Sequence, residues 1–200
     1  MSSVLAFDFG ASSGRAILGT CENGKITLKE AHRFSNDPVQ VNGTFYWDVL
    51  RLFYEIKQGI LKAKAAGGFE SIGIDTWGVD FGLLDKNGRL LSNPVHYRDR
   101  RTEGAVRQSE KYISNDRLYE ISGIQFMEFN TVFQLMRLNE TDPAQLAAAD
   151  RLLQGFFCEL FARRGGWTHR FARVLDILQD RYQVSLPWER VFEVEAHYTP

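Results

Sequence analysis

Short apolar runs separated by turn residues dominate the start of the chain. Residues 4–7 form an apolar run that ends at an aspartate, as a buried strand would. Residues 15–20 are apolar again, and residues 26–34 alternate between apolar and polar side chains. Between these two segments the Asn23-Gly24 pair favours a tight hairpin, because both central residues of such a turn need a positive φ. The pattern predicts three successive antiparallel strands.

A long helix and further strands are expected next. Residues 47–66 carry apolar side chains at helical spacing, and Gly67-Gly68 follows them as a C-terminal cap would. Residues 70–75 are typical of a strand, residues 83–91 of a second hairpin with an Asn-Gly turn, and the chain beyond residue 101 of helices. Because three strands come before the first helix, the order predicts an α/β layer with a mixed sheet. The apolar positions of the long helix are Val49, Leu52, Phe53, Ile56 and Ile60.

The composition argues against several classes of partner. Among the 200 residues, 24 basic and 25 acidic side chains leave a formal net charge of -1, which predicts no affinity for nucleic acid or an anionic membrane. The two cysteines, Cys21 and Cys158, form no C-x-x-C pair, so neither a disulfide scaffold nor a zinc site is expected. The start has no signal-peptide pattern, and no apolar run is long enough to span a bilayer. We therefore expect a cytoplasmic protein.

The most informative segment runs from Asp8 to Arg15. Its small residues form a turn between two strands, where main-chain N–H groups and the hydroxyls of Ser12 and Ser13 can approach a phosphate closely. Asp8 is well placed to hold, through water, the Mg²⁺ that accompanies ATP. No Walker string occurs anywhere in the chain. An ordinary hairpin would use the same small residues, and spacing alone does not decide between the two interpretations.

A second candidate segment, residues 75–81, also follows a strand. Its two carboxylates and the indole of Trp77 are suited to line a pocket for a polyhydroxylated ligand, with the ring against an apolar sugar face. The simpler interpretation is a strand end with Trp77 in the core. Taken alone, this segment favours the simpler interpretation.

Together these segments resemble the FGGY family of carbohydrate kinases, and within it the kinases that act on L-rhamnulose. The resemblance covers about residues 1–153. It implies an actin-like, ribonuclease-H-type fold in which two domains close over a cleft. It also implies that ATP, with Mg²⁺, phosphorylates the 1-hydroxyl of L-rhamnulose. The matching strings are residues 6–15, 32–34, 71–81, 94–102 and 122–131.

The resemblance assigns roles to individual residues. Asp8 matches the carboxylate near the metal, and Gly78 matches a position that contacts the sugar. The residues that match the loop around the ATP phosphates are Ala11, Ser12, Ser13, Gly14 and Arg15. The residues expected as further neighbours of the sugar are Trp77, Asp80, Gln125 and Phe129.

The resemblance stops after residue 153. The family continues with a Met-Pro-Asp turn, whereas here residues 154–200 form a divergent tail, which we attribute to a disrupted reading frame or a wrongly assigned gene end. The catalytic base of the family is an aspartate in a later Gly- or Ser-His-Asp string, which is absent, as is the second domain that holds the adenine. We therefore expect residues 1–153 to be the first part of the N-terminal kinase domain, with no catalytic residue in this chain.

Three functions remain open. The first is a sugar kinase by descent with an incomplete chain, and the second is a non-catalytic remnant that exposes apolar surface meant for the missing half. The third is a ribonuclease-H-like nuclease that uses Asp8, Asp75 and Asp80 as a two-metal cluster. The balanced charge and the family strings both argue against the nuclease.

Overall fold

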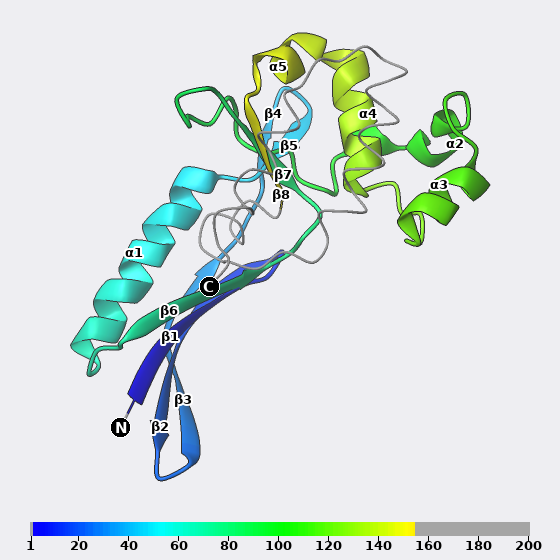
Figure 1. Cartoon of the computed structure of the whole chain (residues 1–200). Coiled ribbons are helices and arrows are strands. Elements are labelled where there is room, and N and C mark those ends of the chain that lie inside the picture. The colour runs from blue at the N-terminus through cyan, green and yellow to red at the C-terminus, as the bar shows by residue number, and fades with distance from the viewer. Residues whose placement is uncertain (1, 155–200) are drawn as a thin grey trace. The chain divides into compact units, whose positions relative to one another are not determined.

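The computed structural model describes residues 2–154, which Figure 1 shows as coloured ribbon. These residues divide into two compact units, one ending at Gly78 and the other beginning at Val79. Apart from Gln154, the divergent tail predicted at 154–200 lies outside the described residues.

A mixed four-stranded sheet forms the basis of the first unit. Its strands are β1 (Ser2–Phe9), β2 (Ser13–Glu22), β3 (Lys25–Ser35) and β6 (Ser71–Thr76), in the spatial order β3-β2-β1-β6. The first three strands pair antiparallel in succession, and β6 joins β1 in parallel. The mixed sheet and the three opening strands predicted from the sequence are confirmed.

Two hairpins of this unit turn on an Asn-Gly pair. At Asn23-Gly24, between β2 and β3, the φ angles are 50° and 75°, as predicted. A second hairpin, β4 (Val39–Val41) and β5 (Thr44–Tyr46), turns at Asn42-Gly43 with φ angles of 50° and 83°. This second hairpin was not predicted, although an Asn-Gly pair between short β-branched and aromatic runs is a strong hairpin signal.

Helix α1 (Val49–Ala65) begins and ends at recognisable capping groups. The Asp48 carboxylate accepts a hydrogen bond from the Arg51 N–H at 3.0 Å, so the helix starts two residues later than predicted. At the other end, the Gly68 N–H donates to the Ala63 carbonyl at 3.0 Å, which closes the expected glycine cap.

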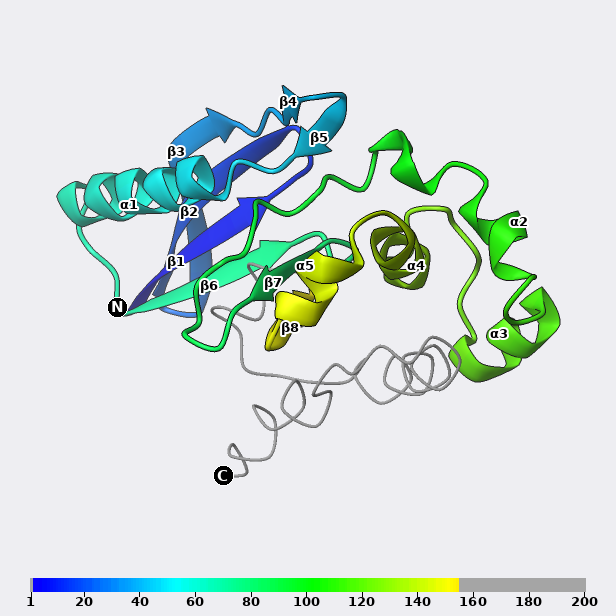
Figure 2. The same cartoon turned by 90° about the horizontal axis from the view of Figure 1, so that it is seen from above.

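One face of the sheet is covered by α1 (Figures 1 and 2). The helix approaches closely at Gly59, where a Cβ atom would lie 2.6 Å from the Phe7 ring. Phe53, predicted on the apolar face, is 46% exposed, because the buried stripe follows Leu52, Ile56 and Ala63 and leaves Phe53 beside it. The apolar sheet residues buried in this core are Leu5, Phe7, Phe9, Ala16, Leu18 and Phe34.

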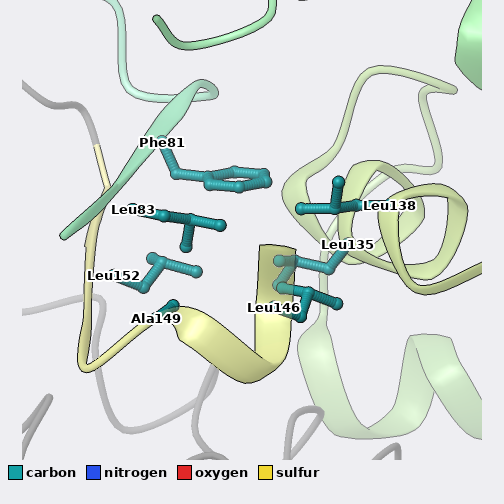
Figure 3. Packing of buried hydrophobic residues seen from close by; sticks show 7 residues of the cluster. All are labelled: Phe81, Leu83, Leu135, Leu138, Leu146, Ala149 and Leu152. Atoms are coloured by element: carbon teal, nitrogen blue, oxygen red, sulfur yellow. The ribbon is translucent and has the colours of Figure 1, made fainter. Parts of the chain in front are cut away.

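The second unit combines short helices with a pair of strands. The helices predicted beyond residue 101 are confirmed as far as residue 148, but residues 151–154 form a strand that was not predicted. Seven residues from the two strands, the last two helices and the link after the last helix form one core cluster, and their side chains point toward one another in Figure 3. The elements are β7 (Phe81–Leu84), a 3-10 turn (Arg100–Thr102), α2 (Ala105–Ser109), α3 (Asn115–Ser122), α4 (Thr131–Thr141), α5 (Pro143–Ala148) and β8 (Arg151–Gln154). The cluster consists of Phe81, Leu83, Leu135, Leu138, Leu146, Ala149 and Leu152.

The hairpin predicted over residues 83–91 forms, with an antiparallel bridge between Leu84 and Leu90 and a cross-strand backbone hydrogen bond of 2.9 Å on either side of it. The Asp85 carboxylate accepts hydrogen bonds from the N–H groups of Asn87 and Arg89, both at 2.8 Å. These bonds hold the pKa of Asp85 below its usual value. The Asp85 carbonyl also accepts a hydrogen bond from the Gly88 N–H at 2.9 Å, so the backbone and the side chain of Asp85 together hold the predicted turn.

Candidate functional site

The turn between β1 and β2 is held by a residue from a third strand. Within the turn, the Gly10 N–H donates to the Ser13 carbonyl at 2.9 Å. Asn36, which follows β3 and is 4% exposed, donates its backbone N–H to the Ser12 carbonyl and its side-chain amide to the Gly10 carbonyl, at 3.0 and 2.9 Å. Asn36 therefore fixes the backbone conformation of the loop through these two hydrogen bonds.

Small residues are needed in this loop for packing as well as for any ligand. Gly14 is buried, and a Cβ atom there would clash with the ring of Phe34 on β3. Within residues 2–154, no acceptor takes a hydrogen bond from the N–H of Ala11 or Ser12. Two adjacent main-chain donors at an exposed loop are what an anion-binding nest requires.

Asp8 and Arg15 lie directly across from each other on β1 and β2 and form an ion pair of 2.5 Å. Both side chains are 43% exposed. Because side chains alternate along a strand and Phe7 and Phe9 face α1, Asp8 lies on the other face of the sheet. A carboxylate and a guanidinium therefore stand together where β1 ends, open to a ligand.

The end of β6 lies beside the same loop. In the parallel register Asp8 is opposite Asp75, and Phe9 is opposite Thr76. Neighbouring parallel strands have their carboxyl ends at the same edge of the sheet. Ligands of open α/β sheets bind just outside these strand ends. The loop after β1 and the segment that contains Gly78 therefore start side by side at this edge.

Trp77 is half-buried and stacks on Trp47, with ring centroids 4.0 Å apart and planes inclined by 25°. Trp47, just before α1, is 1% exposed. One face of the Trp77 ring is thus covered by the core of the first unit, which agrees with the simpler interpretation of this segment. Gly78 is exposed, and no described atom lies within 4 Å of the place where a Cβ atom would be.

Asp80 is 2% exposed and belongs to the second unit. Its two carboxylate oxygens accept hydrogen bonds from the Gln134 side-chain amide at 3.1 Å and from the Tyr97 N–H at 3.3 Å. Both oxygens are therefore engaged by protein donors. Gln134 was not predicted, although a glutamine inside the apolar run Val-Phe-Gln-Leu-Met is a signal for a buried hydrogen-bonding role.

The other two predicted sugar neighbours also lie in the second unit. Gln125 is exposed, and Phe129 is half-buried with its ring edge-on to Tyr97 at 5.6 Å. Next to Tyr97, His96 is 3% exposed and accepts a hydrogen bond from the Arg98 N–H at its Nδ1. Burial, with the Arg98 charge, lowers the pKa of His96 to about 4.

The two-metal cluster required by the nuclease hypothesis is not formed in the part of the chain that the structure describes. No three His, Cys, Asp or Glu side chains in residues 2–154 come together as a metal site requires. The same residues contain no helix with the length and apolar content needed to cross a bilayer.

Comparison with known sequences identifies relatives of most of the chain. Residues 3–158 match the N-terminal domain of the FGGY family of carbohydrate kinases. A rhamnulokinase of Halalkalibacterium halodurans is 49% identical over 144 residues, which are 72% of this chain and 31% of the relative. A rhamnulokinase of Oceanobacillus iheyensis is 46% identical over 151 residues, or 74% and 32%. The chain spans about a third of the length of these curated relatives.

Solved structures of a xylulose kinase and a gluconate kinase share the fold. A ligand-bound xylulose kinase from Lactobacillus acidophilus matches with a TM-score of 0.72 at 15% identity, over 90% of this chain and 40% of that one. A gluconate kinase from Lactobacillus acidophilus matches with a TM-score of 0.66, also at 15% identity, over 76% and 31%. These similarities confirm the predicted actin-like fold with its mixed sheet.

Proposed function

Because the chain belongs to the FGGY family of carbohydrate kinases, we propose that it is part of an ATP-dependent kinase that phosphorylates the 1-hydroxyl of L-rhamnulose in the cytoplasm. The sugar is proposed because the relatives that are 40–49% identical are rhamnulokinases. The observation that carries the proposal is the loop after β1. It has two free main-chain donors and lies beside the end of β6.

The loop fits the phosphates of a nucleotide. The N–H groups of Ala11 and Ser12 are donors without described acceptors, and two serine hydroxyls add to them. Bound ATP supplies the phosphoryl group, and Mg²⁺ neutralises part of its charge. Asp8, half-exposed and paired with Arg15, is the residue that would hold the ion through water. The proposed phosphate-binding residues are Ala11, Ser12, Ser13, Gly14 and Arg15.

The sugar site is proposed to begin at the edge of the sheet where β6 ends. Gly78 is exposed and leaves room for a ligand, and the half-buried Trp77 offers an aromatic surface nearby in sequence. From the second unit, Asp80, Gln125 and Phe129 are the proposed contributors. Asp80 would act mainly by holding backbone, since both of its carboxylate oxygens already accept hydrogen bonds from the protein.

We further propose that residues 1–153 are the first part of the kinase domain. The base that takes the proton of the sugar hydroxyl, and the adenine site, would then lie in the two thirds of the relatives that this chain does not span. The 200-residue chain should accordingly bind ligands without turning them over. ADP formation with L-rhamnulose by this chain would refute that part of the proposal.

Ligand binding tests the function directly. Thermal unfolding should shift upward with ATP–Mg²⁺ and with L-rhamnulose, because ligands that bind only the folded state stabilise it. Replacing Arg15 by Gln should abolish the ATP–Mg²⁺ shift. The matched control is Arg33→Gln, which changes an exposed arginine directly across from Arg15 on β3 and paired with Glu30. An unchanged midpoint with both ligands would reject the kinase assignment and leave the non-catalytic remnant.

A further inference from the structure

One side chain of the second unit connects three segments that are far apart in sequence. Gln134, on the first turn of α4, is 1% exposed. Its amide nitrogen lies within hydrogen-bond distance of the Val79 carbonyl (3.0 Å), the Asp80 carboxylate (3.1 Å) and the Phe129 carbonyl (2.8 Å). Its amide oxygen accepts a hydrogen bond from the Arg101 guanidinium at 2.7 Å. Gln134 is therefore the common partner of these segments.

The chemistry of the surroundings requires a neutral amide at this position. The donor end faces a carboxylate and two carbonyls, and the acceptor end faces a guanidinium. A carboxylate in place of the amide would repel Asp80, and an apolar side chain would leave both Asp80 and Arg101 short of a partner. Buried polar groups that lose their partners carry the full cost of desolvation.

Further hydrogen bonds, made by residues other than Gln134, hold the same segments. The Thr131 hydroxyl donates to the Val79 carbonyl at 2.9 Å, and the Tyr97 N–H donates to the other oxygen of Asp80. The Asp99 carboxylate accepts from the Arg101 N–H at 2.8 Å. Val79 directly follows Gly78 in the chain, so the position of its carbonyl limits the conformations open to Gly78.

We infer that Gln134 is a positioning residue for the sugar site, an inference that rests on the proposed sugar-kinase function. It touches no substrate in this role. It holds the backbone of Val79 and Phe129 and the carboxylate of Asp80 in one arrangement, with Arg101 as the group that orients its amide. Loss of such preorganisation weakens ligand binding because the ordering must then occur on binding.

The test compares affinities of the full 200-residue chain for L-rhamnulose and for ATP–Mg²⁺ by titration calorimetry. Gln134→Met keeps the length of the side chain and removes its hydrogen bonds, and we expect sugar affinity to fall at least tenfold with ATP–Mg²⁺ affinity unchanged. The matched control is Gln145→Met, on α5, where the lost bond is to the Ser92 hydroxyl. That variant should bind both ligands like the wild type.

A second variant separates positioning from general stability. In Gln134→Glu the new carboxylate faces Asp80 and Arg101, the two charged side chains bonded to Gln134 within the described residues. Two close carboxylates repel each other, so the pair binds one proton with a raised pKa. The protonated acid can then donate a hydrogen bond to Asp80 as the amide does. Sugar affinity of this variant should therefore recover as pH falls from about 8 to about 5, while the wild type and Gln134→Met stay flat.

The outcomes are distinct. Wild-type sugar affinity in Gln134→Met, or a Gln134→Glu variant whose sugar affinity ignores pH, overturns the inference alone. Equal loss of sugar and ATP–Mg²⁺ affinity in Gln134→Met also overturns it, because that result indicates general unfolding. Failure of the wild type to bind L-rhamnulose while it binds ATP–Mg²⁺ shows that the proposed sugar is wrong, and the inference falls with it.

Discussion

Replacing His96 by Asn should remove a pH dependence of stability that the wild type carries between neutral and acidic pH. In the folded chain His96 is buried, and its pKa is lowered to about 4. In the unfolded chain its pKa is about 6.5. The unfolded state therefore takes up a proton first as the pH falls. The stabilisation is complete above the unfolded pKa and is lost as the pH falls toward the folded pKa.

The size of the effect follows from the two pKa values. One pH unit is worth about 1.4 kcal/mol for each proton that the unfolded state alone binds. Over the whole interval the loss is about 3 kcal/mol, and between pH 6.5 and 5 it is about 2 kcal/mol. Stability of small domains is about 5–15 kcal/mol, so the change is readily measured.

The assay is urea unfolding at several pH values, compared between the wild type and His96→Asn. The Asn oxygen can occupy the place of Nδ1 and accept from the Arg98 N–H, but it does not titrate in this range. The other histidines are shared by both proteins and cancel in the difference. Amide exchange in peptides that cover residues 79–101 checks that the loss arises in the second unit. Parallel pH profiles for the two proteins would refute the reasoning.

Three further predictions concern the first unit. Gly59→Ala should destabilise the chain by about 1–3 kcal/mol in urea unfolding despite the better helix former, because its methyl group meets the Phe7 ring, whereas Gly73→Ala, with no described atom nearby, should not. Glu55→Gln should lower the free energy of unfolding by about 1–3 kcal/mol, because the buried carboxylate accepts hydrogen bonds from His32 and Arg51. Its control, Glu30→Gln at an exposed position, should leave the unfolding midpoint unchanged. Equal midpoints for the two variants would contradict this prediction. Trp77→Phe should remove the Trp–Trp coupling from the circular dichroism spectrum, and its persistence would mean that the Trp47 stack is absent in solution.

Local patterns were sufficient to predict most elements of the first unit, the β4–β5 hairpin excepted. Alternation and the Asn-Gly signal of residues 23–24 describe groups that interact over a few residues, and the structure confirms them. The prediction for Phe53 was wrong because helical spacing gives the width of an apolar stripe but not its centre, which depends on the sheet beneath. The 83–91 hairpin of the second unit is confirmed because its turn, too, is held by local hydrogen bonds, which Asp85 makes.

The residue types of the candidate site could be predicted from the sequence, but the residues that hold them in place by hydrogen bonds could not. The small-residue turn after Asp8 and the glycine after β6 stand out in the sequence, and the parallel pairing of β1 with β6 places them at one edge. The groups that hold them, Asn36 and Gln134, act across 26 and more than 50 residues. No local rule connects such distant positions, so their roles emerge only from the fold.

The dependence of the turn between β1 and β2 on Asn36 has a consequence for the order of folding. The small residues of the turn allow many paths, and the amide beyond β3 selects one of them. Folding must therefore complete the whole three-stranded meander before the turn acquires its working shape. Nucleotide affinity should thus appear late on the folding pathway. A substitution in β3 that displaces Asn36 should change the conformation of the loop after β1, even though the substituted residue does not contact that loop.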